Sequence, residues 1–171
     1  MLNKEVEKKL NIQVGKEVYS SHLYLAMACW AETRGYNGIA GWLYQQADEE
    51  KVHMLRLVRY INERDGKAVI PKVDKPPEDF SSVQKMFEMT LEHEQYISAS
   101  INEIVAVCEK EKDYTTHNWI QWFVTEQIEE EKSANEILDK LKLVGDNNMY
   151  MFDRDILTLR SGGTEGALAV E

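Results

Sequence analysis

Hydrophobic residues recur along this chain with the spacing of an α-helix over four long segments. The pattern predicts a short amphipathic helix over 149–159 and four long helices, at about 4–34, 38–65, 81–110 and 113–144. Gly35, Gly66 and Gly145 follow three of the long segments, where glycine commonly ends a helix. Ser81 and Gln84 have the spacing of a capping box at the start of the third helix.

The connections between these segments indicate how the helices are arranged. The first and second helices, and the third and fourth, are joined by only a few residues, which predicts two antiparallel hairpins. The middle connection, 66–80, contains three prolines and some 15 residues, which can reach about 50 Å when extended. A helix of about 27 residues is roughly 40 Å long, so this connection can cross the whole bundle. The fold class predicted is all-α: a four-helix bundle with one long crossover between helices 2 and 3 and a short fifth helix.

Length and composition narrow the class of protein. The 171 residues fit one domain over 1–160, followed by a small, polar stretch at 161–171 that we expect to be a flexible tail. The formal charge of −10 argues against binding nucleic acid, and the chain lacks the apolar run of about 20 residues that spans a membrane. The N-terminal segment is charged from Lys4 and does not resemble a signal peptide, so we expect a cytoplasmic protein. Cys29 and Cys108 form no disulfide framework and are expected to be small buried side chains.

Polar residues interrupt the apolar face of each long helix near its middle. Counted from the hairpins, these residues fall within about one helical turn of the same level. The candidate cluster comprises Glu17, Glu50, His53, Glu94, Gln127 and Glu130.

Four carboxylates at one level of a bundle core are unfavourable unless something neutralises them. Burying one unpaired ion carries an effective penalty of several kcal/mol. Either the carboxyl groups are largely protonated or a cation binds among them. Carboxylates with an imidazole suit iron, manganese or zinc, and the number of carboxylates favours two ions sharing a bridging ligand over one closed zinc site. A purely structural helical oligomer with protonated or hydrated carboxyl groups is the alternative without a metal.

The sequence around these residues resembles the bacterial-type non-haem ferritins from Met1 to about Leu159. The resemblance rests on four segments that contain the candidate cluster, at 15–21, 48–53, 92–95 and 125–131. It implies a ferritin-like bundle with a di-iron ferroxidase centre. Glu17, Glu50 and His53 would hold one iron, and Glu50, Glu94 and Glu130 the second, with Gln127 helping to position the pair.

The resemblance also implies residues around the centre. A third iron position would use Glu49, Glu126, Glu129 and Glu130. Tyr24 matches a tyrosine that the family keeps beside the centre, and Trp122 matches a nearby aromatic residue; both could supply electrons, although core packing is the simpler interpretation. The fourth helix has Gln127-x-x-Glu130 where bacterioferritins repeat Glu-x-x-His, so we expect no haem and a second iron that is readily passed on.

The function implied by the resemblance is iron storage and detoxification. The protein would be a ferroxidase that oxidises Fe(II) to Fe(III) with oxygen or hydrogen peroxide and deposits ferric mineral inside a hollow homo-oligomer of 24 subunits. The alternative enzyme is a di-iron peroxidase or oxygenase that acts on a separate substrate. Apolar residues on most faces of 23–30, and on the last short helix, were expected to need neighbouring subunits to cover them.

Overall fold

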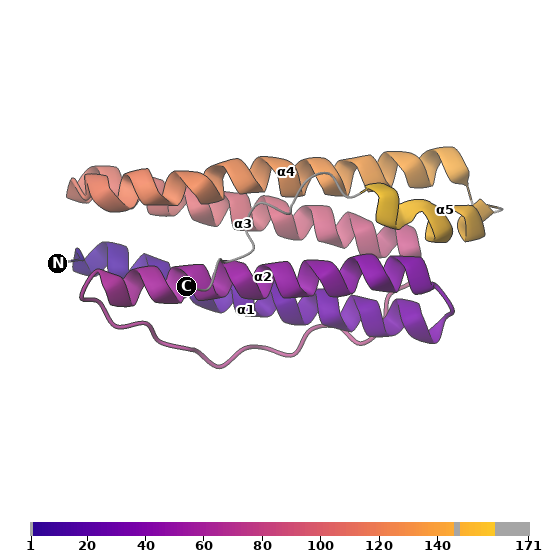
Figure 1. Ribbon diagram of the computed structural model, residues 1–171, viewed down its shortest axis with the longest axis horizontal. Helices are drawn as coiled ribbons and strands as arrows, with labels where there is room; N and C mark the ends of the chain where they lie inside the picture. The colour runs from indigo at the N-terminus through magenta and orange to yellow at the C-terminus, as the bar shows by residue number, and fades with distance from the viewer. Residues whose placement is uncertain (1, 146–147, 160–171) are drawn as a thin grey trace, which may run out of the picture.

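The computed structural model describes residues 2–145 and 148–159 and shows an elongated bundle of four long helices (Figure 1). The elements are α1 (Lys4–Thr33), α2 (Asn37–Glu63), α3 (Val83–Glu111), α4 (Tyr114–Val144), α5 (Met149–Asp155) and the 3-10 helix η2 (Ile156–Leu159). The predicted fold class is confirmed, with α1 and α2 forming one hairpin and α3 and α4 the other. No helix among these described residues is long and apolar enough to cross a membrane. The predicted tail, 161–171, lies outside the described residues.

Side chains at three of the N-terminal ends stabilise the helices. Asn3, Ser82 and Asp113 each accept a hydrogen bond from the first turn of α1, α3 and α4, satisfying amide groups that have no partner within the helix. The predicted capping box was wrong by one residue, because Ser82 rather than Ser81 caps α3, and its helix begins at Val83.

The connection between α2 and α3 is an extended segment without regular secondary structure, and it runs along the outside of the first hairpin (Figure 1). It is fastened to α1, where the amides of Lys67 and Val69 donate to Glu7 Oε1 at 3.0 Å and Asn11 Oδ1 at 2.7 Å. Pro71 packs so closely on α1 that a Cβ atom on Gly15 would lie 2.9 Å from its Cγ. The crossover therefore returns the chain to the far end of the bundle, which makes α2 and α3 run in the same direction.

The core consists of two apolar clusters with a polar layer between them. One cluster, at the end that carries α5, contains Trp42, Phe87 and Phe152. The other, at the end that carries the N-terminus, contains Leu10 and Phe123. Along each long helix the buried sequence passes from one cluster to the other through polar residues, so the bundle is held at both ends and leaves a defined layer for chemistry.

The short helix α5 packs across the end of the bundle onto the start of α2. A Cβ atom on Gly38 would lie 1.7 Å from the carbonyl oxygen of Asp153, so only glycine permits this approach. The Asp153 carboxylate accepts a hydrogen bond from the amide of Ile39 at 2.8 Å, which caps a helix whose own N-cap residue supplies no side-chain bond. Phe152 and Ile156 are buried in the chain's own core, so the expectation that they require a neighbouring subunit was wrong for these two residues.

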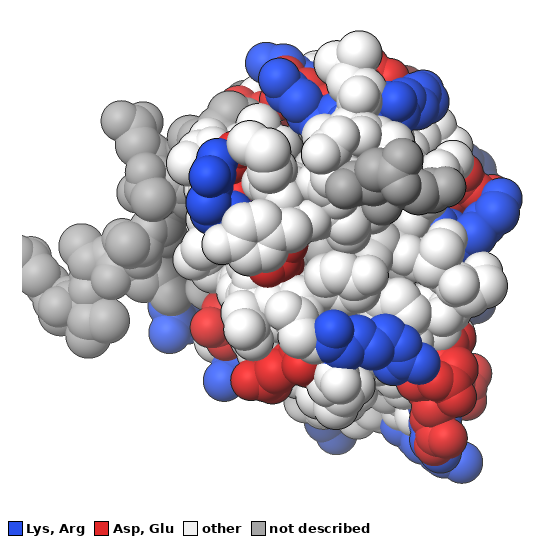
Figure 2. All heavy atoms as spheres, turned by 90° about the vertical axis from the view of Figure 1, so that its right-hand side faces the viewer, with Lys and Arg blue, Asp and Glu red and all other residues white. Residues whose placement is uncertain are grey.

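Exposed apolar side chains remain at this end of the molecule. The surface seen end-on is mostly uncharged over its middle, apart from a small acidic patch, and charged residues border it (Figure 2). The large apolar residues exposed at this end are Leu143 at the end of α4, Tyr150 and Met151 on α5, and Leu157 on η2.

The apolar run at 23–30 is covered mainly by the chain itself. Five of its residues are buried in the subunit, whereas Leu25 and Cys29 are exposed on α1. The two cysteines are free, with Cys108 buried, so the expectation of a buried side chain was wrong for Cys29.

Candidate metal centre

The polar layer of the core brings together one level of all four long helices. Every member of the candidate cluster is buried, with at most 7 % of its surface exposed. The members are Glu17 on α1, Glu50 and His53 on α2, Glu94 on α3, and Gln127 and Glu130 on α4. No lysine or arginine is buried anywhere in residues 2–145 or 148–159, so the layer has no fully enclosed cation.

The carboxylate and imidazole groups form two sets that could each hold a metal ion. In the first, Glu17, Glu50 and His53 offer ligand atoms that all lie within 4.8 Å of one another. In the second, the same holds for His53 together with Glu49, Glu126 and Glu130. His53 Nδ1 lies 3.4 Å from Glu50 Oε2 and Nε2 lies 3.9 Å from Glu126 Oε1, so the imidazole faces both sets.

Burial and mutual repulsion make the anionic form of these carboxyl groups unfavourable. Burial raises the pKa of Glu17 and of Glu50 well above the ordinary value, and the charges of Glu50 and Glu94, respectively, raise them further. Burial and the charge of Glu94 also raise the pKa of Glu130 well above the ordinary value. Burial also raises the pKa of Glu94, although the hydrogen bond from Tyr24 acts in the opposite direction. A bound cation would remove this penalty, because it stabilises every carboxylate at once.

Two oxygen atoms in the layer have no hydrogen-bond partner. These are Oε2 of Glu17 and Oε2 of Glu50, both fully enclosed. A buried acceptor without a donor is rare in proteins and calls for a specific explanation, such as an ion. Both atoms belong to the first ligand set, so the donors present there fit a divalent cation.

The other oxygen atoms are held by neutral donors. Gln13 Nε2 donates to Glu17 Oε1 at 2.8 Å, and Gln46 Nε2 donates to Glu130 Oε2 at 2.9 Å. Both glutamines were missed as site residues, although each lies one helical turn before a predicted ligand on the same helix. Neutral hydrogen-bond donors of this kind fix the orientation of metal ligands without bringing a positive charge that would compete with the metal ion.

Glu94 is held by two side chains from neighbouring helices. The Tyr24 hydroxyl donates to its Oε1, and burial raises the pKa of Tyr24 well above the ordinary value, which keeps the phenol protonated. Gln127 Nε2 lies 3.1 Å from Glu94 Oε2 and donates to it. The structure therefore places both residues in direct contact with a predicted ligand.

Aromatic rings enclose the imidazole of His53. The ring centroid of Trp122 lies 5.4 Å from that of His53, and the centroid of Phe123 lies 6.0 Å away, both nearly perpendicular. The guanidinium of Arg56 stacks over Trp122, 4.1 Å from the ring centroid. Burial raises the pKa of Glu126, and the charge of the partly enclosed Arg56 acts in the opposite direction.

The predicted third position is only partly assembled by the structure. Glu49 and Glu126 are half-buried and join the second ligand set, whereas Glu129 is exposed and belongs to neither set. The second set includes His53, which the sequence had assigned to the first iron alone.

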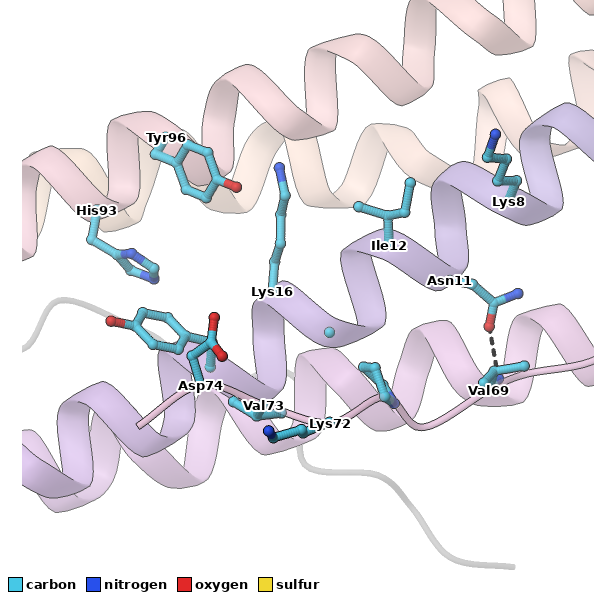
Figure 3. A pocket seen from close by; sticks show the side chains of 13 residues that line it. Lys8, Asn11, Ile12, Lys16, Val69, Lys72, Val73, Asp74, His93 and Tyr96 are labelled. Carbon is cyan, nitrogen blue, oxygen red and sulfur yellow. Dashed lines mark hydrogen bonds between the residues drawn. The ribbon is translucent and has the colours of Figure 1, made fainter. Parts of the chain in front are cut away.

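A surface groove lies away from this layer, between α1, α3 and the crossover (Figure 3). It has a volume of about 740 Å³ and is lined by lysines, tyrosines and His93. Asp74 is the sole carboxylate among its described lining residues, so the groove does not share the ligand chemistry of the buried layer.

Fold and site together define a four-helix bundle with a buried carboxylate–histidine centre, and comparison with known proteins identifies the family. A family model described as ferritin-like domain matches residues 7–144. A bacterial non-heme ferritin of Campylobacter jejuni is 42 % identical over 158 residues, which cover 91 % of this chain and 95 % of the relative. One of Escherichia coli O6:H1 is 39 % identical over 161 residues, covering 93 % and 98 %.

Solved structures agree with this assignment. An open pore ferritin from Archaeoglobus fulgidus superimposes with a TM-score of 0.89 at 34 % identity, covering 91 % of this chain and 96 % of that one. The chain therefore belongs to the ferritin family.

Proposed function

We propose that this protein stores iron, and that it oxidises Fe(II) to Fe(III) at the centre between its four helices before ferric mineral is deposited. The buried layer is the observation that supports the proposal. It gathers four carboxylates and a histidine, two of the carboxylate oxygen atoms have no hydrogen-bond partner, and no lysine or arginine is enclosed among the described residues. The same chemistry would suit manganese or zinc, and the ferritin relatives favour iron.

The proposed ligands of the first iron are the first ligand set of the structure, and those of the second iron follow from the resemblance to ferritins. Glu17, Glu50 and His53 would bind one Fe(II), and the second would lie between Glu50, Glu94 and Glu130, with Glu50 shared. The set containing Glu49 and Glu126 supports a third iron position beside the pair. Glu129 would join it by reaching inward from the surface.

Two Fe(II) ions held together can deliver two electrons in one event. Two Fe(II) and two protons reduce one oxygen molecule to hydrogen peroxide, or one peroxide molecule to two water molecules, and yield two Fe(III). The carboxylates stabilise the higher charge of the ferric product. Tyr24, which donates to Glu94, and Trp122, whose ring lies beside His53, would be the residues that lend electrons when a reaction needs more than the iron pair supplies.

The assembly is proposed from the same relationship. We propose a hollow homo-oligomer of 24 subunits in the cytoplasm, with residues 1–160 forming the domain and with no bound haem. The exposed apolar residues at the α5 end support a contact between subunits there.

The test is aerobic Fe(II) oxidation by a Glu50→Ala, His53→Ala double variant. Even residues that only hydrogen-bond to metal ligands contribute roughly 10–100-fold to affinity or activity, so loss of two ligands should slow initial oxidation by about a hundredfold or more. Glu136→Ala, on the exposed face of α4, is the matched control and should oxidise iron at the parent rate. Sizing of both variants establishes that they assemble.

Unchanged oxidation by the double variant would remove this centre from the reaction. Counting iron per particle after aerobic loading separates storage from catalysis on another substrate. A storage protein accumulates far more iron than its ligand sets hold, whereas a di-iron oxygenase retains only about two ions per subunit.

A further inference from the structure

A small pocket on the groove between α3 and α4 lies beside the centre. It has a volume of about 150 Å³, enough for several water molecules, and it is open to the surface. Ser98 and Asn102 line it from α3, and Gln127, Ile128 and Glu131 line it from α4.

One side chain, that of Gln127, both lines this pocket and contacts a residue of the centre. Gln127 lines the pocket, and its Nε2 donates to Glu94 at Oε2, at 3.1 Å, and at the backbone oxygen, at 3.2 Å. The same amide also lies 3.4 Å from the hydroxyl oxygen of Ser98. Rotation of a glutamine side chain requires no backbone movement, and it would open Glu94 Oε2 to the pocket.

The pocket presents one negative charge toward solvent. Glu131 is the sole carboxylate among the described residues that line it, and it is only partly exposed. The Ser98 hydroxyl donates to its Oε1, which fixes the carboxylate at the pocket and leaves Oε2 outside that bond. Ser98 therefore joins the outer carboxylate to the amide that covers Glu94.

We propose that this pocket is the port through which Fe(II) reaches the centre, with Glu131 as the first contact and Gln127 as the gate. The proposal rests on the proposed function. A cation would meet Glu131 and the oxygen atoms of Ser98 and Asn102, and would pass to Glu94 when the Gln127 amide moves aside. One carboxylate attracts a divalent ion without holding it strongly, which is what a transit position requires.

A second approach to the centre exists on the flank between α2 and α4, at Glu49 and Glu126. There, four ligand groups converge within 4.8 Å, so a cation would be retained rather than passed on. This difference in ligand number is the reason for assigning entry to the Glu131 side.

The experiment measures the rate and the extent of metal binding separately. Oxygen-free Co(II) is mixed with the assembled protein in a stopped-flow instrument, and tryptophan fluorescence reports arrival beside His53, where Trp122 lies. Titration calorimetry gives the number of Co(II) ions bound at equilibrium. Glu131→Gln keeps the oxygen that accepts from Ser98 and removes the charge, and Ile128→Phe narrows the mouth from an exposed position without adding a tryptophan to the signal.

Both variants should bind Co(II) roughly tenfold more slowly than the parent, since local charge at a binding cleft changes on-rates by about 10–10³-fold. Their final stoichiometry should equal that of the parent. Glu136→Gln, five residues further along α4 at an exposed ion pair, should leave the rate unchanged.

Parent-like rates in both port variants, or a slow rate only in a Glu126→Gln variant, would overturn the port. A reduced stoichiometry for Glu131→Gln would also overturn it, because Glu131 would then be a ligand. Failure of the parent protein to bind Co(II) at all would instead refute the proposed function.

Discussion

Replacing Glu17 by glutamine should stabilise the metal-free protein while weakening its metal site. Glu17 is buried, its Oε2 has no partner, and the nearby Glu50 Oε2 also lacks one. Glutamine keeps the oxygen that accepts from Gln13 and replaces the unpartnered oxygen with an amide that can donate to Glu50. The variant therefore removes the unfavourable buried charge of Glu17 and gives Oε2 of Glu50 a hydrogen-bond donor.

The size of the effect follows from the burial of the charge. An unpaired buried ion carries a penalty of several kcal/mol, part of which protonation already relieves, so we expect a gain of about 2 kcal/mol at pH 7.5. In a chain of this length 1 kcal/mol changes Tm by about 2–4 °C, which gives an increase of about 4–8 °C in EDTA. Glu136→Gln, at an exposed ion pair, should stay within about 0.5 kcal/mol of the parent.

Zinc should cancel this advantage. At a free Zn(II) concentration one hundred times the parent Kd, binding stabilises the parent by about 2.7 kcal/mol per site. If loss of the Glu17 ligand weakens binding about a hundredfold, the variant gains only about 0.4 kcal/mol at the same concentration. Thermal melts at one fixed protein concentration, in EDTA and in Zn(II), measure both differences. A Glu17→Gln variant that is less stable than the parent in EDTA would refute the reasoning, because the carboxylate would then stabilise the unloaded fold.

Further predictions concern pH, a hydrogen bond and the core. Burial raises the pKa of Glu17 and Glu50, so above about pH 4.3 the folded metal-free protein binds more protons than the unfolded chain. Its free energy of unfolding therefore falls as pH rises. Urea midpoints in EDTA should decrease from pH 5 to pH 7.5, and they should decrease less steeply for Glu17→Gln. Tyr24→Phe removes a donor to a buried carboxyl group and should lower the free energy of unfolding by about 1.5–3 kcal/mol in urea titrations, whereas a change below about 0.5 kcal/mol would show that the bond contributes nothing. Phe87→Ala empties a fully buried position between Trp42 and Phe152, and it should lower the free energy of unfolding by about 3–5 kcal/mol in the same assay. A smaller decrease would mean that the α5 end of the core repacks.

The fold was predictable because its determinants are local or follow from connection length. Helical periodicity located the four long helices to within about two residues, and the length of the 66–80 connection established the crossover. The errors arose where neighbouring residues compete or where tertiary contacts decide. Ser81 and Ser82 are equally good caps by type, and only the backbone shows that Ser82 is used.

Tertiary contacts also explain the errors at the α5 end and on α1. Apolar periodicity could not distinguish residues buried by the chain itself, such as Phe152, from residues left exposed, such as Met151. The approach of Asp153 to Gly38 turns α5 onto the bundle and decides between them. Cys29 lies on a face of α1 that the surrounding apolar sequence made appear buried.

The candidate cluster was visible in the sequence because its members interrupt apolar stripes at one level. Its hydrogen bonds were not visible, since they depend on side-chain reach between helices. Gln46 bonds across the bundle to Glu130, and Ser98 links Gln127 to Glu131. The pairing of His53 with two ligand sets likewise depends on the position of α4 relative to α2.

The most direct test of the central claim is a crystal structure of the assembled protein after an oxygen-free soak in Fe(II), with anomalous diffraction recorded at the iron edge. We expect two iron ions within each subunit, one bound by Glu17, Glu50 and His53 and the other by Glu50, Glu94 and Glu130. Anomalous density confined to the protein surface, with none between the four helices, would contradict it.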